Sequence, residues 1–277
     1  MLRNQCVALL SLLALVWSSQ VSSQTVVEEI PRTAEGTPRL DGIWQALSEA
    51  NWDIRPHAAG HALLPELGTF TAIHPGLGIV EGGALPYQEW AAARQQENFA
   101  NRLELDPEGK CFMPGVPRAT YMPFPFQILQ TPDLVMIAYQ YANAVRTIHM
   151  NDPGPAPNNS WMGWSVGRWE GDTLVVNVTD MSEQTWFDRA GNFHSEALRV
   201  VERYTVLSPN HLLYEATIED PDVFTRPWSI SLPLYRRVEE NIELMEFKCV
   251  EFAEEYMYGE FRKPGTTRAG ARPETDN

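Results

Sequence analysis

The sequence is short of positive charge. It has 21 lysine and arginine residues against 36 aspartate and glutamate residues, and its formal charge at pH 7 is −15. A protein of this charge repels the phosphate backbone of nucleic acids and the surface of anionic membranes. We therefore expect no nucleic-acid partner, and the charge also mildly disfavours acidic substrates.

Long apolar runs are also scarce. The first, Val7 to Trp17, follows the positive Arg3 and precedes the small residues Ser22 and Ser23. This order is typical of a secretory signal peptide, which we place at residues 1–23. The run is too short for a permanent membrane anchor, and no later segment is long and apolar enough to replace it. The sequence therefore predicts a secreted or periplasmic protein with no membrane anchor after signal cleavage.

Cysteine is rare, with three residues in the whole chain. Cys6 lies in the expected signal, so Cys111 and Cys249 remain as an even pair in an oxidising compartment. This favours a disulfide between them, which would stabilise the fold by roughly 4–5 kcal/mol in the chain-entropy description. Two buried thiols are the alternative. A catalytic cysteine is not favoured, because neither residue follows a histidine or starts a helix.

Motifs for cofactors and metals are missing. The chain has no glycine-rich nucleotide-binding loop, and we expect no cofactor. His57 and His61 have the spacing of one helical turn, but Gly60 and the neighbouring prolines argue against a helix, so no metal is expected. Ser195 lacks the Gly-x-Ser-x-Gly context of a hydrolase nucleophile.

The chain divides into four regions by composition. After the signal, residues 24–85 are rich in glycine and proline and are expected to form an arm or a lid. Residues 86–262 are expected to form a helix followed by an antiparallel β domain. Residues 263–277 have no large apolar side chain and are predicted to be a disordered tail.

The main domain is predicted to be all-β with one flanking helix. The helix spans residues 86–103, with Pro86 in its first turn. Short alternating segments separated by turn residues then predict an antiparallel meander that closes into a lipocalin-like barrel or folds into a β-sandwich. Gly42-Ile43-Trp44 resembles the opening of lipocalin-type barrels. Strands are expected at residues 40–44, 126–130, 134–140, 144–150, 161–169, 173–179, 197–207, 211–219, 227–236 and 242–250.

Aromatic residues gather in the segment 161–203, which we interpret as the wall of a pocket. Trp161, Trp164 and Trp186 lie there, and Tyr121 comes from a proline-rich stretch before it. Such side chains stack on sugar rings and on flat apolar ligands, so these four are the predicted ligand-binding residues. The alternative for each of them is ordinary core packing.

The loop from Asp188 to Glu196 is the predicted catalytic element. His194 titrates near neutrality and can give or take a proton, and Asp188 or Glu196 could orient it. The alternative is a histidine with local hydrogen bonds and a solvated glutamate. Arg118 and Arg203 are candidates for stabilising negative charge on a substrate, or else partners in salt bridges.

Four sequence blocks occur in order between residues 114 and 251: PGVPR (114–118), WMGWSVGRWEGDTLVV (161–176), TWFDRAGNFHS (185–195) and EFKCVE (246–251). Together they resemble a family of exported bacterial proteins whose activity is uncharacterised. The resemblance covers about residues 86–252. It implies an exported bacterial setting and a single domain over these blocks, and it implies no particular activity.

Three functions are open from these observations, one of them an interaction protein that uses the glycine- and proline-rich residues 24–85 and would expose an apolar patch instead of a pocket. The other two involve a pocket. The first is a cofactor-independent enzyme that uses general acid/base chemistry on a small, partly apolar molecule, as an isomerase, lyase or hydratase does. The second is a lipocalin-like binding protein for an apolar molecule or a glycan, without catalysis. The second needs the tryptophans but not His194.

Overall fold

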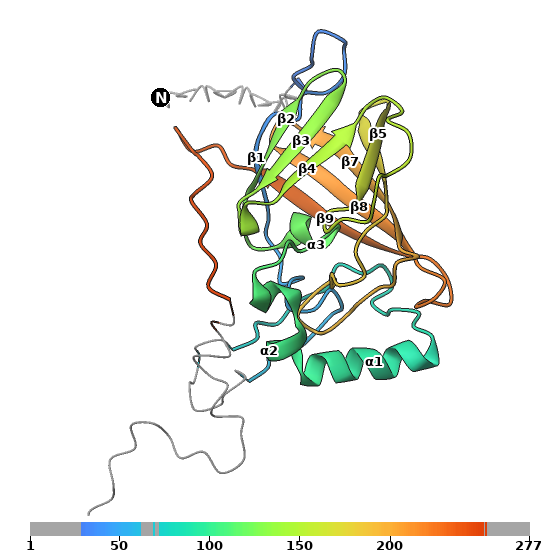
Figure 1. The fold of residues 1–277 in the computed structure, drawn as a ribbon. Coiled ribbons are helices and arrows are strands. Elements are labelled where there is room, and N and C mark those ends of the chain that lie inside the picture. Colours follow the sequence, from blue (N-terminus) through green and yellow to red (C-terminus); the bar gives the residue numbers. More distant parts are fainter. Residues whose placement is uncertain (1–28, 62–68, 70–71, 252, 254–277) are drawn as a thin grey trace, which may run out of the picture.

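The computed structural model describes residues 29–61, 69, 72–251 and 253. The expected signal peptide and the expected tail lie outside these residues. Within them, nine strands form a closed barrel (Figure 1). The strands are β1 Gly42–Ala46, β2 Phe126–Gln130, β3 Leu134–Tyr139, β4 Val145–His149, β5 Trp164–Glu170, β6 Thr173–Thr179, β7 Arg199–Ser208, β8 His211–Glu219 and β9 Trp228–Arg236.

Neighbouring strands are antiparallel with one exception. β4 and β5 run parallel, with Ile148 opposite Ser165 and His149 opposite Val166. Parallel neighbours need a long connection back to the same end of the sheet, and residues 150–163 provide it. β9 then pairs with β1, with Ala46 opposite Leu234, and closes the ring. The predicted barrel is therefore confirmed, with this one parallel pair inside the meander.

The expected strand at residues 242–250 does not form. Both edges of β9 are already paired, with β8 on one side and β1 on the other, so no edge remains for a further strand. The segment is instead an extended stretch of largely exposed residues. The ninth strand is β1, which corresponds to the strand expected at residues 40–44. This part of the range 24–85 therefore belongs to the barrel and not to an arm.

Period-2 alternation explains why these segments are strands. In β7 and β8 every second residue is buried, and Tyr204 lies directly opposite Tyr214 inside the barrel. Gly171 makes the turn between β5 and β6 with a φ of +60°, a conformation that glycine adopts without strain. Trp44 is buried, and the guanidinium of Arg236 lies 4.2 Å from its ring.

The barrel interior also holds a buried ion pair. Arg146 on β4 contacts the carboxylate of Glu202 on β7, and Tyr204 and Tyr214 donate hydrogen bonds of 3.0 and 2.8 Å to the same carboxylate. Burial opposes the charge on Arg146, but Glu202 outweighs this effect and raises the pKa of the guanidinium. Arg146 also donates to Ser165 at 2.9 Å. The pair is enclosed and fully partnered, so we assign it to the core.

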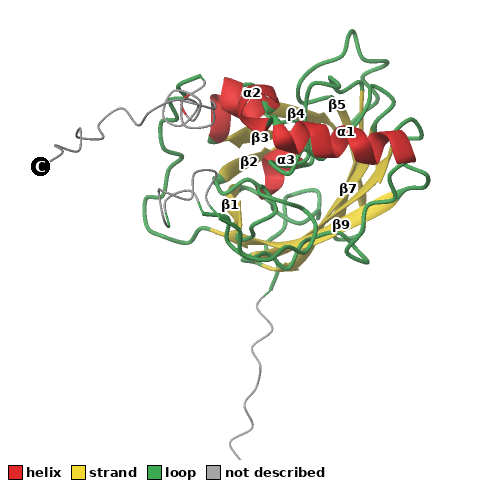
Figure 2. Ribbon diagram, turned by 90° about the horizontal axis from the view of Figure 1, so that it is seen from below, coloured by secondary structure: helices red, strands yellow, loops and turns green. Residues whose placement is uncertain are grey.

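The helices gather at one end of the barrel, where Figure 2 shows them in front of the opening. Figure 1 shows α3 nearest the strands and α1 and α2 beyond it. α3 is entirely buried and closes this end. We call residues 47–57, 86–121 and 180–198, which lie at this end, the cap. The helical segments are α1 Glu89–Ala100, α2 Arg102–Leu105, η2 Pro107–Lys110, α3 Arg118–Tyr121 and, outside the cap, η3 Tyr141–Asn143.

The predicted helix over residues 86–103 is found as α1, with α2 following it after a break at Asn101. Helix α3 was not predicted, because its four residues lie in a proline-rich stretch. No helix in the described part of the chain is long and apolar enough to cross a membrane.

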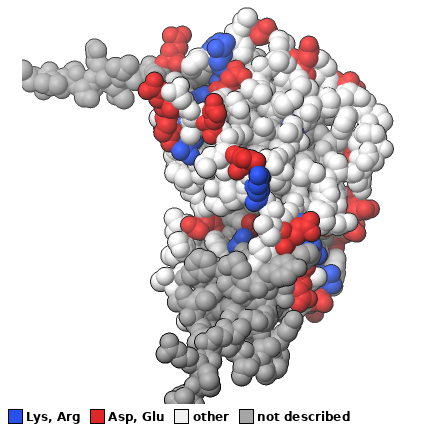
Figure 3. Space-filling model, turned by 60° about the vertical axis from the view of Figure 1, so that its left-hand side comes forward, with Lys and Arg blue, Asp and Glu red and all other residues white. Residues whose placement is uncertain are grey.

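The predicted disulfide between Cys111 and Cys249 is present, with Cα atoms 5.7 Å apart. It joins the end of η2 in the cap to the extended segment after β9. Charged side chains are scattered over the surface. On the face that Figure 3 shows, the few basic side chains lie among acidic ones.

Candidate functional site

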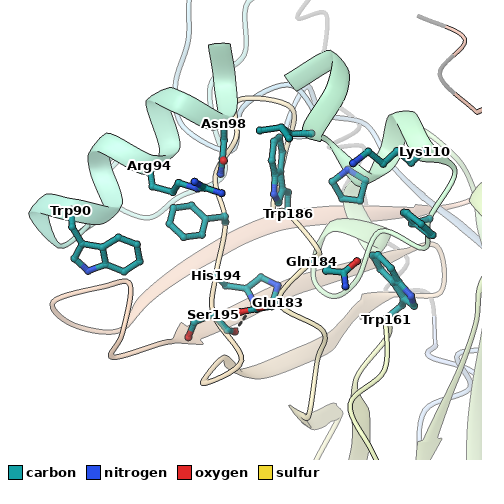
Figure 4. Close-up of a pocket in the computed structure, with 14 residues that line it drawn as sticks. Trp90, Arg94, Asn98, Lys110, Trp161, Glu183, Gln184, Trp186, His194 and Ser195 are labelled. Carbon is teal, nitrogen blue, oxygen red and sulfur yellow. Dashed lines mark hydrogen bonds between the residues drawn. The ribbon is translucent and has the colours of Figure 1, made fainter. Parts of the chain in front are cut away.

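A cavity of about 580 Å³ lies in the cap, outside the barrel. Its walls come from α1, from the segment 105–112, from the loop between β6 and β7 and from Trp161 in the connection between β4 and β5, as Figure 4 shows. The pocket wall expected from the segment 161–203 therefore exists, but the barrel strands do not enclose it. Five aromatic side chains line the cavity: Trp90, Phe112, Trp161, Trp186 and Phe193.

Helix α1 supplies one wall. Trp90, Arg94 and Asn98 are spaced four residues apart, so they share one face of the helix. Asn98 also donates to the carbonyl of Gly191 at 3.2 Å, and Gln95 donates to the carbonyl of Ala190 at 2.5 Å. These bonds attach the helix to the loop between β6 and β7, residues 180–198, which we call the site loop, and hold the two walls at a fixed separation.

Two aromatic pairs form the ends of the cavity. Phe112 and Trp161 are stacked, with ring centroids 4.6 Å apart and planes 13° apart. Trp90 and Phe193 meet edge to face at 6.0 Å. Trp90 is 53% exposed and Phe112 is 42% exposed, which is unusual for side chains of this size. The rings therefore leave apolar surface uncovered around the opening.

His194 lies at the floor of the cavity and is 3% exposed. Its Nδ1 lies 2.8 Å from the carbonyl oxygen of Ser195, which can only accept, so Nδ1 carries the proton. The Nε2 atom then accepts a hydrogen bond from the Thr185 hydroxyl at 2.6 Å. Burial lowers the pKa of His194, so the imidazole is neutral at pH 7.

The carboxylates expected beside His194 are elsewhere. Glu196 is exposed. Asp188 is fully buried and accepts hydrogen bonds from the backbone N–H of Ile54 at 2.9 Å and from the side chain of Asn192 at 2.6 Å. Burial and the nearby Asp53 raise the pKa of Asp188 to about 7. It joins the site loop to Ile54 and makes no hydrogen bond to His194.

Arg118 is also buried away from the cavity. It pairs with Asp106 at 2.9 Å and with Glu108 at 2.7 Å, and it donates to Asn51 at 2.9 Å. Glu108 binds Arg189 of the site loop as well, at 2.7 Å. Burial alone would raise the pKa of Glu108, but Arg189 and Arg118 lower it to about 2. This network holds the cap segments together, and Arg118 does not line the cavity.

Arg203, Trp164 and Tyr121 complete the expected residues. Arg203 pairs with Glu170 at 3.0 Å and is far from the cap in the barrel register. Trp164 packs on His149 with ring centroids 4.6 Å apart. Tyr121 is buried and donates to the carbonyl of Phe187 at 2.7 Å. Of the expected site residues, the structure therefore brings His194, Trp161 and Trp186 to one cavity.

The sequence did not indicate the other walls. Trp90 and Arg94 belong to the predicted helix. Their spacing of four residues, continued by Asn98, was the feature of the sequence that could have indicated a shared helix face. Lys110 and Phe112 flank Cys111, which drew attention only as a disulfide candidate. Within the described residues, no group of three or more potential ligands is placed to hold a metal ion.

Comparisons of the chain with protein-family models, with curated proteins and with solved structures found no match. The function is therefore argued from the geometry of the cavity.

Proposed function

We propose that the protein binds a small, flat, partly apolar molecule in the cap cavity. The convergence of five aromatic side chains on one cavity of about 580 Å³ carries this proposal. Small-molecule sites have volumes of about 300–1,000 Å³ and are lined mainly by apolar and aromatic side chains. A ligand in the cavity would cover the exposed faces of Trp90 and Phe112, which stay in contact with water otherwise.

The two walls are fixed independently of a ligand. The loop is attached to α1 by Asn98 and Gln95 and to residues 51–54 by Asp188 and Arg189, so it needs no ligand to take its shape. A preformed wall reduces the entropy that is lost on binding.

A matched pair of tryptophans tests this proposal. Trp161 lines the cavity and Trp164 does not, although both are half-buried and three residues apart. With N-phenyl-1-naphthylamine as a neutral fluorescent probe, Trp161→Ala is expected to weaken binding about tenfold, the size of a lost aromatic contact with its buried area. Trp164→Ala is expected to leave it unchanged. Equal affinity in both variants, or no binding to the unmodified protein, would contradict the proposal.

Acid/base catalysis at His194 is the second candidate. It is supported by the neutral imidazole on the cavity floor, whose tautomer the Ser195 carbonyl fixes. Its Nε2 is the basic atom, and a substrate would reach it by displacing the Thr185 hydroxyl or by exchanging a proton through it. This catalytic candidate does not involve the other residues expected from the sequence, namely Asp188, Glu196, Arg118 and Arg203.

His194→Gln separates the two candidates. Molecules that bind in the cavity are incubated with the protein, and the products are followed by mass spectrometry. Loss of a chemical conversion with retained affinity supports the enzyme. Binding without conversion in both the unmodified protein and the variant supports the carrier.

We also propose that the protein works outside the cytoplasm. The Cys111–Cys249 disulfide supports this, because such bonds persist in oxidising compartments. The amino-terminal sequence of the protein recovered from the producing cells, together with a thiol titration before and after reduction, tests it. A chain that retains residues 1–23 and has three free thiols, Cys6, Cys111 and Cys249, would contradict it.

A further inference from the structure

The charge in the cavity is opposite to the charge of the protein. Among the described residues, two positive side chains, Arg94 and Lys110, and one carboxylate, Glu183, line the cavity, whereas the whole chain has a formal charge of −15. With His194 neutral, the lining is net positive. A ligand inside a cavity responds to the charges that face it more than to distant ones, which the solvent screens.

We propose that the ligand of this cavity is a flat aromatic anion, with a carboxylate or a sulfonate group that Lys110 binds. The inference rests on the proposed binding function and specifies the chemical class of the ligand. It also revises the expectation from overall charge that acidic ligands are disfavoured.

Among the residues that the structure describes, no carboxylate pairs with Lys110. The acidic residues that precede it closely, Asp106 at the cap of η2 and Glu108 within η2, are both buried and both pair with Arg118, and Glu108 also pairs with Arg189. Within the described residues Lys110 makes no ion pair. An ammonium without a carboxylate partner is available to a ligand, and a bond to an anionic oxygen is among the stronger hydrogen bonds.

The backbone around Lys110 is held in place. Lys110 is the last residue of η2, whose first turn is capped by Asp106, which accepts from the Glu108 N–H at 2.9 Å. The next residue, Cys111, is fixed by the disulfide to Cys249. The side chain of Lys110 therefore extends from a fixed backbone position.

Lys110 also lies beside an aromatic surface. Phe112 follows two residues later and is stacked on Trp161, and Figure 4 shows Lys110 and Trp161 on the same side of the cavity. A ring that packs against this stacked pair would carry an attached anionic group toward the ammonium. An apolar wall with a cation at its edge fits an aromatic carboxylate or sulfonate better than a neutral glycan, which needs paired donors and acceptors.

Arg94 provides a weaker second contact. It comes from α1, on the side of the cavity formed by Trp90 and Phe193, and it pairs with Glu97 at 3.1 Å. Both partners of this pair are more than half exposed, and exposed pairs of this kind are weak and easily exchanged. An anionic ligand would compete with Glu97 for Arg94, so we expect a smaller effect from this residue than from Lys110.

Two probes with the same ring system test the inference. 1-Anilinonaphthalene-8-sulfonate carries a sulfonate, and N-phenyl-1-naphthylamine is its neutral counterpart. Lys110→Gln is expected to weaken binding of the sulfonate about tenfold, as loss of a charge-assisted hydrogen bond does, and to change binding of the neutral probe less than twofold. Arg94→Gln is expected to weaken the sulfonate about threefold. Added salt should weaken the sulfonate and leave the neutral probe unchanged.

Lys248→Gln is the matched control, because it removes the same charge at an exposed site outside the cavity. It is expected to leave both affinities unchanged. Binding of the neutral probe to Lys110→Gln also shows that this variant is folded and that its cavity is intact.

The outcomes separate the two levels of the proposal. If both probes bind, depend on Trp161 and are equally insensitive to Lys110→Gln, the anion inference fails and the binding function stands. Equal losses for Lys110→Gln and Lys248→Gln also overturn the inference, because they would reflect overall charge alone. If neither probe depends on Trp161, the binding function and the inference fail together.

Discussion

The barrel and the cap differ in what holds them together. In the barrel, strands that follow one another in the sequence pair with one another, and alternate side chains fill an interior that is mainly apolar and holds one buried ion pair, Arg146–Glu202, among the described residues. In the cap, segments from three distant parts of the chain meet around buried charges. Arg118 alone joins Asn51, Asp106 and Glu108. Pairing between neighbouring strands requires mainly the right hydrophobic periodicity. The cap depends on a few buried polar side chains, and no other side chain makes the same contacts.

This difference has a consequence for function. Polar bonds have direction, so they fix the relative positions of α1, η2 and the site loop, and these three elements provide most of the walls of the cavity. An apolar contact would allow them to slide. The barrel, closed at this end by α3, provides a rigid base for this arrangement.

The largest effect is expected from Arg118→Met. The change leaves Asp106 and Glu108 buried without their shared cation, which typically costs about 3–5 kcal/mol in the free energy of unfolding. Because the damage is in the cap, we expect binding in the cavity to be lost while the far-ultraviolet circular dichroism of the barrel is retained. Chemical denaturation and probe titration measure the two effects. If the variant loses this stability but still binds the probe, the Arg118 network is not needed for binding in the cavity.

The disulfide is expected to matter less. Replacing Cys111 and Cys249 together by alanine removes a link across 138 residues of sequence, and losses of about 2–4 kcal/mol are typical for such bonds. The link joins the cap to the segment after β9, so the barrel strands should keep their hydrogen-exchange protection. Denaturation of the variant and of the reduced unmodified protein should agree. An unchanged midpoint in both would show that the bond adds no stability.

The pH dependence of stability sharpens the comparison further. The pKa of Asp188 is raised from its ordinary value of 3.8 to about 7, so between these values the folded protein holds a proton that the unfolded chain has released. The free energy of unfolding should therefore fall as the pH rises from about 4 to 7, by up to about 1.4 kcal/mol per pH unit from this group.

Asp188→Asn removes the titration and should flatten this slope. The amide loses part of the hydrogen bonding to Ile54 and Asn192, so the variant is expected to be less stable at low pH, and the slope rather than the absolute value is the measurement. Denaturation curves at closely spaced pH values provide it. Identical slopes in the two proteins would show that Asp188 stays ionised in the fold.

The smallest effect is expected from Glu196→Gln and Arg203→Gln. Both residues are candidates on sequence grounds, but Glu196 is exposed and Arg203 pairs with Glu170 at the surface of the barrel. Neither contacts the cavity, so we expect no measurable change in the unfolding midpoint or in probe affinity. A marked loss of binding in either variant would mean that the cavity described here is incomplete.

Much of the barrel was predictable from local pattern. The alternation in residues 199–219, the turn at Gly171 and the even cysteine pair each depend on chemistry that a short window of sequence contains. The prediction of a strand at 242–250 was wrong because the alternating pattern is a local property, whereas the presence of a free strand edge depends on the whole sheet. The edge of β9 is already paired with β1. The parallel pairing of β4 and β5 depends in the same way on where residues 150–163 lead the chain.

The candidate site was predictable only in part. His194, Trp161 and Trp186 lie in one continuous stretch of unusual composition, and a single segment that folds back on itself keeps such residues close. Asp188 was expected to orient His194 because it is near in sequence, but its side chain turns the other way to meet Ile54. Arg118 was expected to face a substrate, but in the fold it lies beside Asp106 and Glu108 and forms buried ion pairs with them.

The sequence by itself determined most of the strands, the pair of cysteines available for a disulfide and the stretch of chain that carries part of the cavity. Hydrophobic periodicity and turn chemistry act over short distances, and two remaining cysteines leave one possible pairing. Closure of the strands into a barrel depends on the pairing of β9 with β1, which the tertiary structure decided. The tertiary structure alone decided that the cavity lies in the cap, that Trp90, Lys110 and Phe112 complete it, and which charges are buried in pairs. Those outcomes depend on contacts between segments that are far apart in the chain, and no local pattern encodes which distant segment will supply the partner.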